Sequence, residues 1–119
     1  MKPSYTLEQR KNQVPKQPTP TVTPREEALY EAARIICGER DAQYGGPEDN
    51  FERIATIWSV IFGTTVTKED VAMAMVAVKI ARYASKSGFQ PDTWIDIAGY
   101  AGCGYEVGKI ENDAKIRHK

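Results

Sequence analysis

The sequence has few residues of the types that hold metals or cross-link small domains. Two cysteines and one histidine occur in 119 residues, and Cys37 and Cys103 are not arranged in a C-x-x-C motif. This excludes a zinc site of the usual pattern and a disulfide framework. The longest apolar run, Val71–Val78, is far shorter than the ~20 residues that cross a bilayer. The N-terminus has no apolar signal segment. We therefore expect no membrane partner and a cytoplasmic location.

The formal net charge is zero, although the charged residues are unevenly distributed along the chain. The 16 basic and 16 acidic residues cancel, but residues 1–25 and the C-terminal end are basic, and residues 26–108 are acidic. An acidic body repels a nucleic-acid backbone, and neither terminus is dense in Lys or Arg. The charge pattern therefore argues against a nucleic-acid partner.

The chain divides into three parts of different composition. Five of the seven prolines lie in the first 24 residues among few aliphatic side chains, so residues 1–25 are predicted to be a disordered, Pro-rich basic arm. Residues 26–112 are predicted to form a helical domain, and residues 113–119 a basic tail. One domain of this size has a modest core, so we expect a homo-oligomer.

Four helices are predicted in residues 26–112, so the fold class is all-α, a compact domain similar to a four-helix bundle. Thr23 to Glu26 is typical of a capping box before a helix that reaches about residue 40. A second helix ends at Gly63. Thr67 caps a third, and its apolar residues 71–84 predict that it is the central helix. A fourth begins at Pro91 and reaches about residue 110. Its four glycines predict close packing, with the Ala74, Ala77, Ala81 and Ala84 face as the expected partner.

Three groups of polar residues stand out as site candidates. The first is the linker from Arg40 through Tyr44 to Asn50, built around a Gly-Gly-Pro turn; it is either a ligand loop or a plain helix connection. The second is Lys79 and Arg82 on the apolar third helix, which either pair with a carboxylate or bind an anion.

The third group is Asp92 and Asp96, which lie one turn apart on the fourth helix. Asp96 lies between two isoleucines, so it is expected to point inward, either to pair with Lys79 or Arg82 or to hold Mg²⁺ together with Glu48 or Glu52. Magnesium needs only one or two protein carboxylates when phosphates complete its shell.

The stretches 39–58, 67–72, 79–82 and 92–100 resemble a small domain of unknown function common in bacteriophage genomes, over residues 27 to about 107. This implies a phage protein acting in the host cytoplasm. More distantly, the helix order and the acidic face resemble the all-α MazG-like nucleotide pyrophosphohydrolases. That resemblance implies a magnesium-dependent enzyme that binds or hydrolyses nucleotides. The chain departs from the carboxylate spacing of those enzymes. Glu31 follows Glu26-Glu27 one position later than the family's motif requires, and Asp92 and Asp96 on the later helix are four residues apart.

If this enzyme interpretation holds, Asp96 and Glu52 are the catalytic residues. The metal ligands are then drawn from Glu48, Glu52, Asp92 and Asp96, while Lys79 and Arg82 contact phosphates and Tyr44 or Trp94 stacks on a base, beside Arg40 and Asn50. The alternative is a non-catalytic helical protein that binds a host factor or sequesters a nucleotide signal.

Overall fold

The computed structural model describes residues 22–38, 42–43 and 45–117. Within these ranges the chain forms four α-helices and no strand: α2 (Pro24–Cys37), α4 (Pro47–Phe62), α5 (Lys68–Ser85) and α6 (Pro91–Arg117). The all-α prediction is confirmed. α6 continues past the predicted end of the domain, so residues 113–117 of the expected tail are helical. Most of the predicted arm, residues 1–21, lies outside the described part. No helix among the described residues is long and apolar enough to span a membrane.

The helix ends follow local side-chain chemistry. The Thr23 hydroxyl accepts a hydrogen bond from the Glu26 backbone N–H, and the Glu26 carboxylate accepts one from the Thr23 N–H. Thr67 and Asp70 form the same reciprocal arrangement at the start of α5. α4 ends at Gly63, whose φ of 65° lies in the left-handed region that glycine adopts without strain. These three boundaries confirm the predictions from the sequence.

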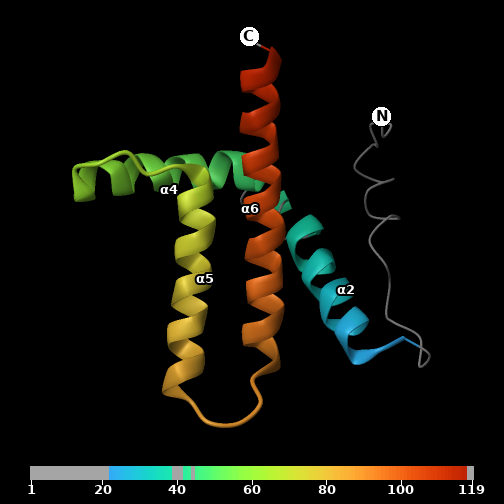
Figure 1. The fold of residues 1–119 in the computed structure, drawn as a ribbon. Helices are drawn as coiled ribbons and strands as arrows, with labels where there is room; N and C mark the ends of the chain where they lie inside the picture. The colour runs from blue at the N-terminus through green and yellow to red at the C-terminus, as the bar shows by residue number, and fades with distance from the viewer. Residues whose placement is uncertain (1–21, 39–41, 44, 118–119) are drawn as a thin grey trace.

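The helices pack around α6 and not around α5. Figure 1 shows α5 and α6 lying side by side as an antiparallel pair, with α4 crossing them near one end and α2 against the other side of α6. α6 contacts each of the other three helices. The prediction that α5 is the central helix was wrong. Only Val71 and Ala72 of α5 are buried, and both lie near its N-terminal end.

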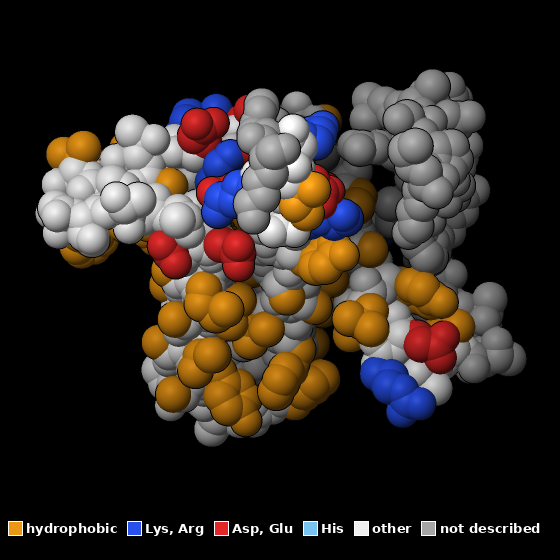
Figure 2. Space-filling view, turned by 45° about the horizontal axis from the view of Figure 1, so that its top comes forward, with side chains coloured by type: hydrophobic (Ala, Val, Ile, Leu, Met, Phe, Trp, Pro, Cys, Tyr) orange, Lys and Arg blue, Asp and Glu red, His pale blue; other side chains and the backbone are white. Residues whose placement is uncertain are grey.

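The core lies where α4 crosses the α5–α6 pair. Its buried members come from all three helices: Phe51, Ala55, Val71, Ala72 and Val107. Beyond this crossing, the second half of α5 has little cover, and Figure 2 shows hydrophobic side chains gathered over the lower part of the α5–α6 pair. A substantial apolar surface is therefore left uncovered in the single chain.

The glycines of α6 allow neighbouring side chains to approach closely. Gly99 and Gly102 lie against Ile36 of α2, and Gly104 lies against Ala72 of α5. The alanine face of α5 that was predicted to pack against these glycines is largely not used, because Ala77, Ala81 and Ala84 are exposed. Close packing at glycine therefore joins α6 to two different helices.

Candidate ligand-binding pocket

A pocket lies between α2, α4 and α6, next to the core. It is lined by Ala32, Ile35 and Ile36 of α2, by Gly45, Pro47, Asn50 and Phe51 at the start of α4, and by Ile95, Asp96, Gly99, Tyr100 and Cys103 of α6. Most of these side chains are apolar, and the polar ones are Asn50, Asp96 and Tyr100. An apolar pocket with a few convergent polar groups is typical of a small-molecule site.

The pocket is small and partly open. About 60 Å³ of the pocket can hold the centre of a water molecule. One ordered water needs roughly 10–15 Å³ by the same measure. The enclosed part therefore has room for a few waters or one planar ring, and the rest of a larger ligand would extend out of the mouth.

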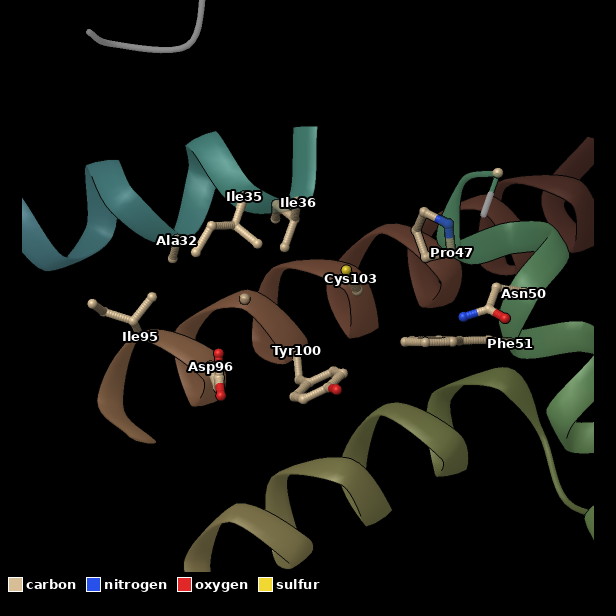
Figure 3. A pocket seen from close by; sticks show the side chains of 12 residues that line it. Ala32, Ile35, Ile36, Pro47, Asn50, Phe51, Ile95, Asp96, Tyr100 and Cys103 are labelled. Atoms are coloured by element: carbon tan, nitrogen blue, oxygen red, sulfur yellow. The ribbon is translucent and has the colours of Figure 1, made fainter. Parts of the chain in front are cut away.

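Asp96 forms an ion pair at the edge of the pocket. Its Oδ2 lies 2.9 Å from the Lys79 Nζ, and the Lys79 side chain is only 15% exposed whereas that of Asp96 is 36% exposed. Figure 3 shows the carboxylate projecting from α6 toward α5. The expected pairing with Lys79 is confirmed. Because Asp96 also lines the pocket, the pair lies beside a cavity and not in a sealed interior.

Asn50 is positioned by the first turn of α4. Gly46 caps the helix, and its carbonyl oxygen accepts hydrogen bonds from the backbone N–H groups of Asp49 and Asn50. Gly45, with φ of 78°, turns the chain into this cap. The half-buried Asn50 side chain lies beside Phe51 in Figure 3 and forms no hydrogen bond with any other described residue. Its amide is therefore available to a ligand.

Several other predicted ligand residues do not line this pocket. Trp94 is exposed on α6, where its ring contacts Tyr83 edge-on with the ring centroids 5.8 Å apart, and its expected stacking on a base stays a prediction. Arg82 is exposed on α5. Arg40 and Tyr44 lie outside the described residues. Of the predicted ligand residues, Asn50 lies in the pocket and Lys79 adjoins it.

The predicted metal ligands are not brought together. Glu48 and Glu52 line a different, open depression between α4, α5 and the later part of α6. There Glu48 accepts a hydrogen bond from the Lys68 ammonium, which raises the pKa of Lys68. Asp92 is exposed in the first turn of α6. Among residues 22–38, 42–43 and 45–117, no three His, Cys, Asp or Glu side chains form a group that could hold a metal ion.

The sequence interpretation missed Phe51, Tyr100 and Cys103 as pocket residues and treated them only as apolar or structural positions. One signal was available. Asp96, Tyr100 and Cys103 are spaced i, i+4 and i+7, which places them on one face of a helix. Nothing in the sequence indicated that the beginning of α4 would close the end of that face.

The fold and the pocket together describe a small all-α domain with an apolar cavity beside an ion pair. The chain belongs to the family described as "Domain of unknown function (DUF6378)", whose model matches residues 27–108. The resemblance to a small phage domain is confirmed. The chain is 48% identical over 75 residues to the Gene 55 protein of Mycobacterium phage L5, covering 62% of this chain and 47% of that protein. It is 44% identical over 78 residues to the Gene 55 protein of Mycobacterium phage D29, covering 66% and 51%.

This chain spans about half the length of these two curated relatives. No solved structure matches it. The likeness to MazG-like pyrophosphohydrolases receives no support from these comparisons and stays a prediction.

Proposed function

We propose that the pocket between α2, α4 and α6 binds the base of a nucleotide, and that the protein holds this ligand without hydrolysing it. The observation that carries the proposal is the combination of the Asn50 amide, which bonds to no other described side chain, and the Asp96 carboxylate in a pocket with mostly apolar walls. This is the sequestering form of the nucleotide-binding hypothesis drawn from the sequence.

The polar groups suit the edge of a heteroaromatic ring. An Asn side chain offers two N–H donors and one carbonyl acceptor, and a carboxylate accepts from ring or exocyclic N–H groups. Phe51 and Tyr100 supply aromatic surface within the same pocket, and planar rings pack well against such surface. The size of the enclosed space also favours one ring over a whole nucleotide.

The phosphates would lie outside the enclosed part. Lys79 adjoins the pocket through its ion pair with Asp96, so its charge is already engaged. A phosphate placed in the pocket would face the Asp96 carboxylate and would compete with it for Lys79. We therefore infer that recognition is dominated by the base, with weak dependence on the number of phosphates.

The donor set of this pocket does not fit a resident magnesium ion. Asp96 is the one carboxylate among the described residues that line it, and its charge is compensated by Lys79. Glu48 and Glu52, which were expected to complete the metal site, lie in the other depression. Hydrolysis therefore rests on the distant resemblance alone, and the residues of this pocket support no magnesium-dependent step.

Binding is tested by calorimetry with a panel of nucleosides and nucleotides at up to about 1 mM, the upper end of ordinary substrate affinities. We expect at least one base to bind, and Asn50→Ala to weaken it about tenfold, because one or two hydrogen bonds worth about 1 kcal/mol each are lost. Asn112→Ala, an exposed asparagine on α6, is the matched control. Binding that is unaffected by Asn50→Ala, or the absence of binding across the panel, contradicts the proposal.

Turnover is tested separately with the same panel in the presence of magnesium. We expect no release of phosphate or pyrophosphate. Release that Asp96→Asn abolishes and Asp113→Asn preserves would instead establish the pyrophosphohydrolase hypothesis, since Asp113 lies further along α6 in an exposed pair with Lys109.

A further inference from the structure

Two apolar stripes run side by side along the uncovered side of the α5–α6 pair. Each repeats at spacings of four, three and four residues, which is the pattern of a helix seam that packs against other helices. The stripes, together called the hairpin face, consist of Met73, Ala77, Ile80 and Ala84 on α5 and Trp94, Ala98, Ala101 and Tyr105 on α6. All of these residues except Ala98 are exposed in the single chain.

The two stripes belong to one continuous surface. The edge-on contact between Tyr83 and Trp94 joins α5 to α6 at its margin. Successive residues of an α-helix are rotated by ~100° about its axis. Ile80 follows Lys79 by one residue and Trp94 precedes Asp96 by two, so both stripes point well away from the Lys79–Asp96 pair. The hairpin face and the ligand pocket are therefore on different sides of the pair.

Charged side chains are absent from this face among the described residues. Figure 2 shows hydrophobic side chains over the lower part of the α5–α6 pair, whereas acidic and basic side chains lie above this patch and to its right, over α2. Depletion of charge at the centre of a patch is characteristic of protein interfaces. A contiguous apolar patch of this extent is unusual on a monomeric protein.

The exposed area matches what a stable dimer buries. Met73 is 70% exposed, Ile80 55%, Trp94 53% and Tyr105 72%. With full areas of about 150–250 Å² for large side chains, these four, Tyr83 and the alanines offer roughly 600–800 Å². A standard interface buries about 800 Å² per partner. The hairpin face is therefore large enough to hold a partner without help from other surfaces.

The weak core of the single chain favours a second copy as that partner. Among the described residues, the buried hydrophobic ones are only six: Ala32, Phe51, Ala55, Val71, Ala72 and Val107. None of them lies in the second half of α5. A two-fold axis through the hairpin face would place α5 and α6 of one copy on α5 and α6 of the other, so that both helices gain a core. Because the hairpin face carries no charge, a charged partner would gain no electrostatic attraction there.

We propose that two copies of this chain associate through their hairpin faces to form an intermolecular four-helix bundle. The dimer buries both stripes and leaves the ligand pockets open on its outer sides. This association is independent of nucleotide binding.

The unaltered full chain is tested first, by sedimentation over about 1–100 μM, the range of ordinary protein association. We expect a mass of twice the 13.3 kDa of one chain and an unfolding temperature that rises with protein concentration. A chain that stays monomeric over this range overturns the proposal, even if a different protein is later found to cover the face.

Point variants then locate the interface. Ile80→Glu is expected to weaken association about 30-fold or more, because it places an unpaired charge at the centre of the face. Ile57→Glu on α4 is the matched control, since Ile57 is 57% exposed and Ile80 is 55% exposed. Circular dichroism checks that both variants keep their helices. A dimer that survives Ile80→Glu, or one that is disrupted by Ile57→Glu instead, overturns the assignment to this face.

Cross-linking provides a test that does not depend on the folding of a charged variant. Ala101→Cys is placed on the α6 stripe, and a short bismaleimide is expected to give a covalent dimer in high yield. The unaltered chain, with Cys37 and Cys103 alone, is the control. Equal yields from the two chains contradict the proposed interface.

Discussion

Two glycines of α6 should respond to the same substitution with opposite signs. Alanine is more favourable than glycine inside a helix by about 1 kcal/mol, so Gly→Ala stabilises wherever the new methyl group has room. At Gly108 the new Cβ would lie 2.8 Å from the Glu69 Oε1. Glu69 is exposed, so its side chain can swing away at little cost. We expect Gly108→Ala to stabilise the fold by about 0.5–1 kcal/mol.

At Gly104 the same methyl group has no room. The Cβ would lie 3.0 Å from the Cβ of Ala72, which is buried and has no rotatable side chain to move. The α5 backbone would have to shift, and overpacking of this kind costs about 1–3 kcal/mol. This exceeds the gain in helix propensity, so Gly104→Ala should be destabilising by about 1 kcal/mol net.

Urea unfolding monitored by circular dichroism measures both effects, with all chains at one concentration. A difference of about 2 kcal/mol between the two variants corresponds to roughly 8–16 °C in unfolding temperature for a domain of this size. Gly102→Ala is a useful intermediate, because its Cβ would lie 3.1 Å from the Ile36 Cδ1, the end of a flexible side chain. If Gly104→Ala is as stable as Gly108→Ala, α5 and α6 are not packed as closely as described.

Three further outcomes follow from local contacts. Thr67→Ala should lower the unfolding free energy by about 1 kcal/mol because it removes the cap of α5, whereas Thr65→Ala in the preceding loop should have little effect. The raised pKa of Lys68 means that its pairing with Glu48 stabilises the fold fully below the ordinary value of 10.5, and that this contribution is lost as the pH rises through the higher folded value. Alkaline urea titrations should therefore show a steeper loss of stability in the unaltered chain than in Glu48→Gln. Asn50→Ala should change stability by no more than about 0.5 kcal/mol, since its amide forms no hydrogen bond with another described residue, and a larger loss in unfolding experiments would mean that the amide is structural.

The helix boundaries were predictable because they depend on neighbouring residues. A capping box needs only Thr23 and Glu26, and the end of α4 needs only a glycine that adopts positive φ at residue 63. Each signal acts within one turn of helix. The extension of α6 to Arg117 was missed because Lys109, Asp113 and their neighbours are polar, and their support comes from exposed pairs such as Lys109–Asp113.

The arrangement of the helices was not predictable to the same degree. An apolar α5 indicates burial, but hydrophobicity does not distinguish burial within one chain from burial between two chains. The crossing of α4 over the α5–α6 pair likewise has no periodic signal. That crossing brings Glu48 to Lys68 and not to Asp96, so these two carboxylates lie apart although each was a reasonable magnesium ligand by itself.

The Lys79–Asp96 pair combines the structural and the ligand-binding explanations that the sequence left open. A lysine inside an apolar helix needs an anion, and Asp96 meets that need at 2.9 Å. Yet the same carboxylate lines the pocket, so the pair presents a compensated charge to any ligand. A free phosphate gains little there, because the cation is already engaged and the anion repels it. An uncharged ring with N–H groups gains a carboxylate acceptor whose position is fixed by Lys79. The pair that stabilises α5 against α6 thereby favours a neutral base over an anion as the group that enters the pocket.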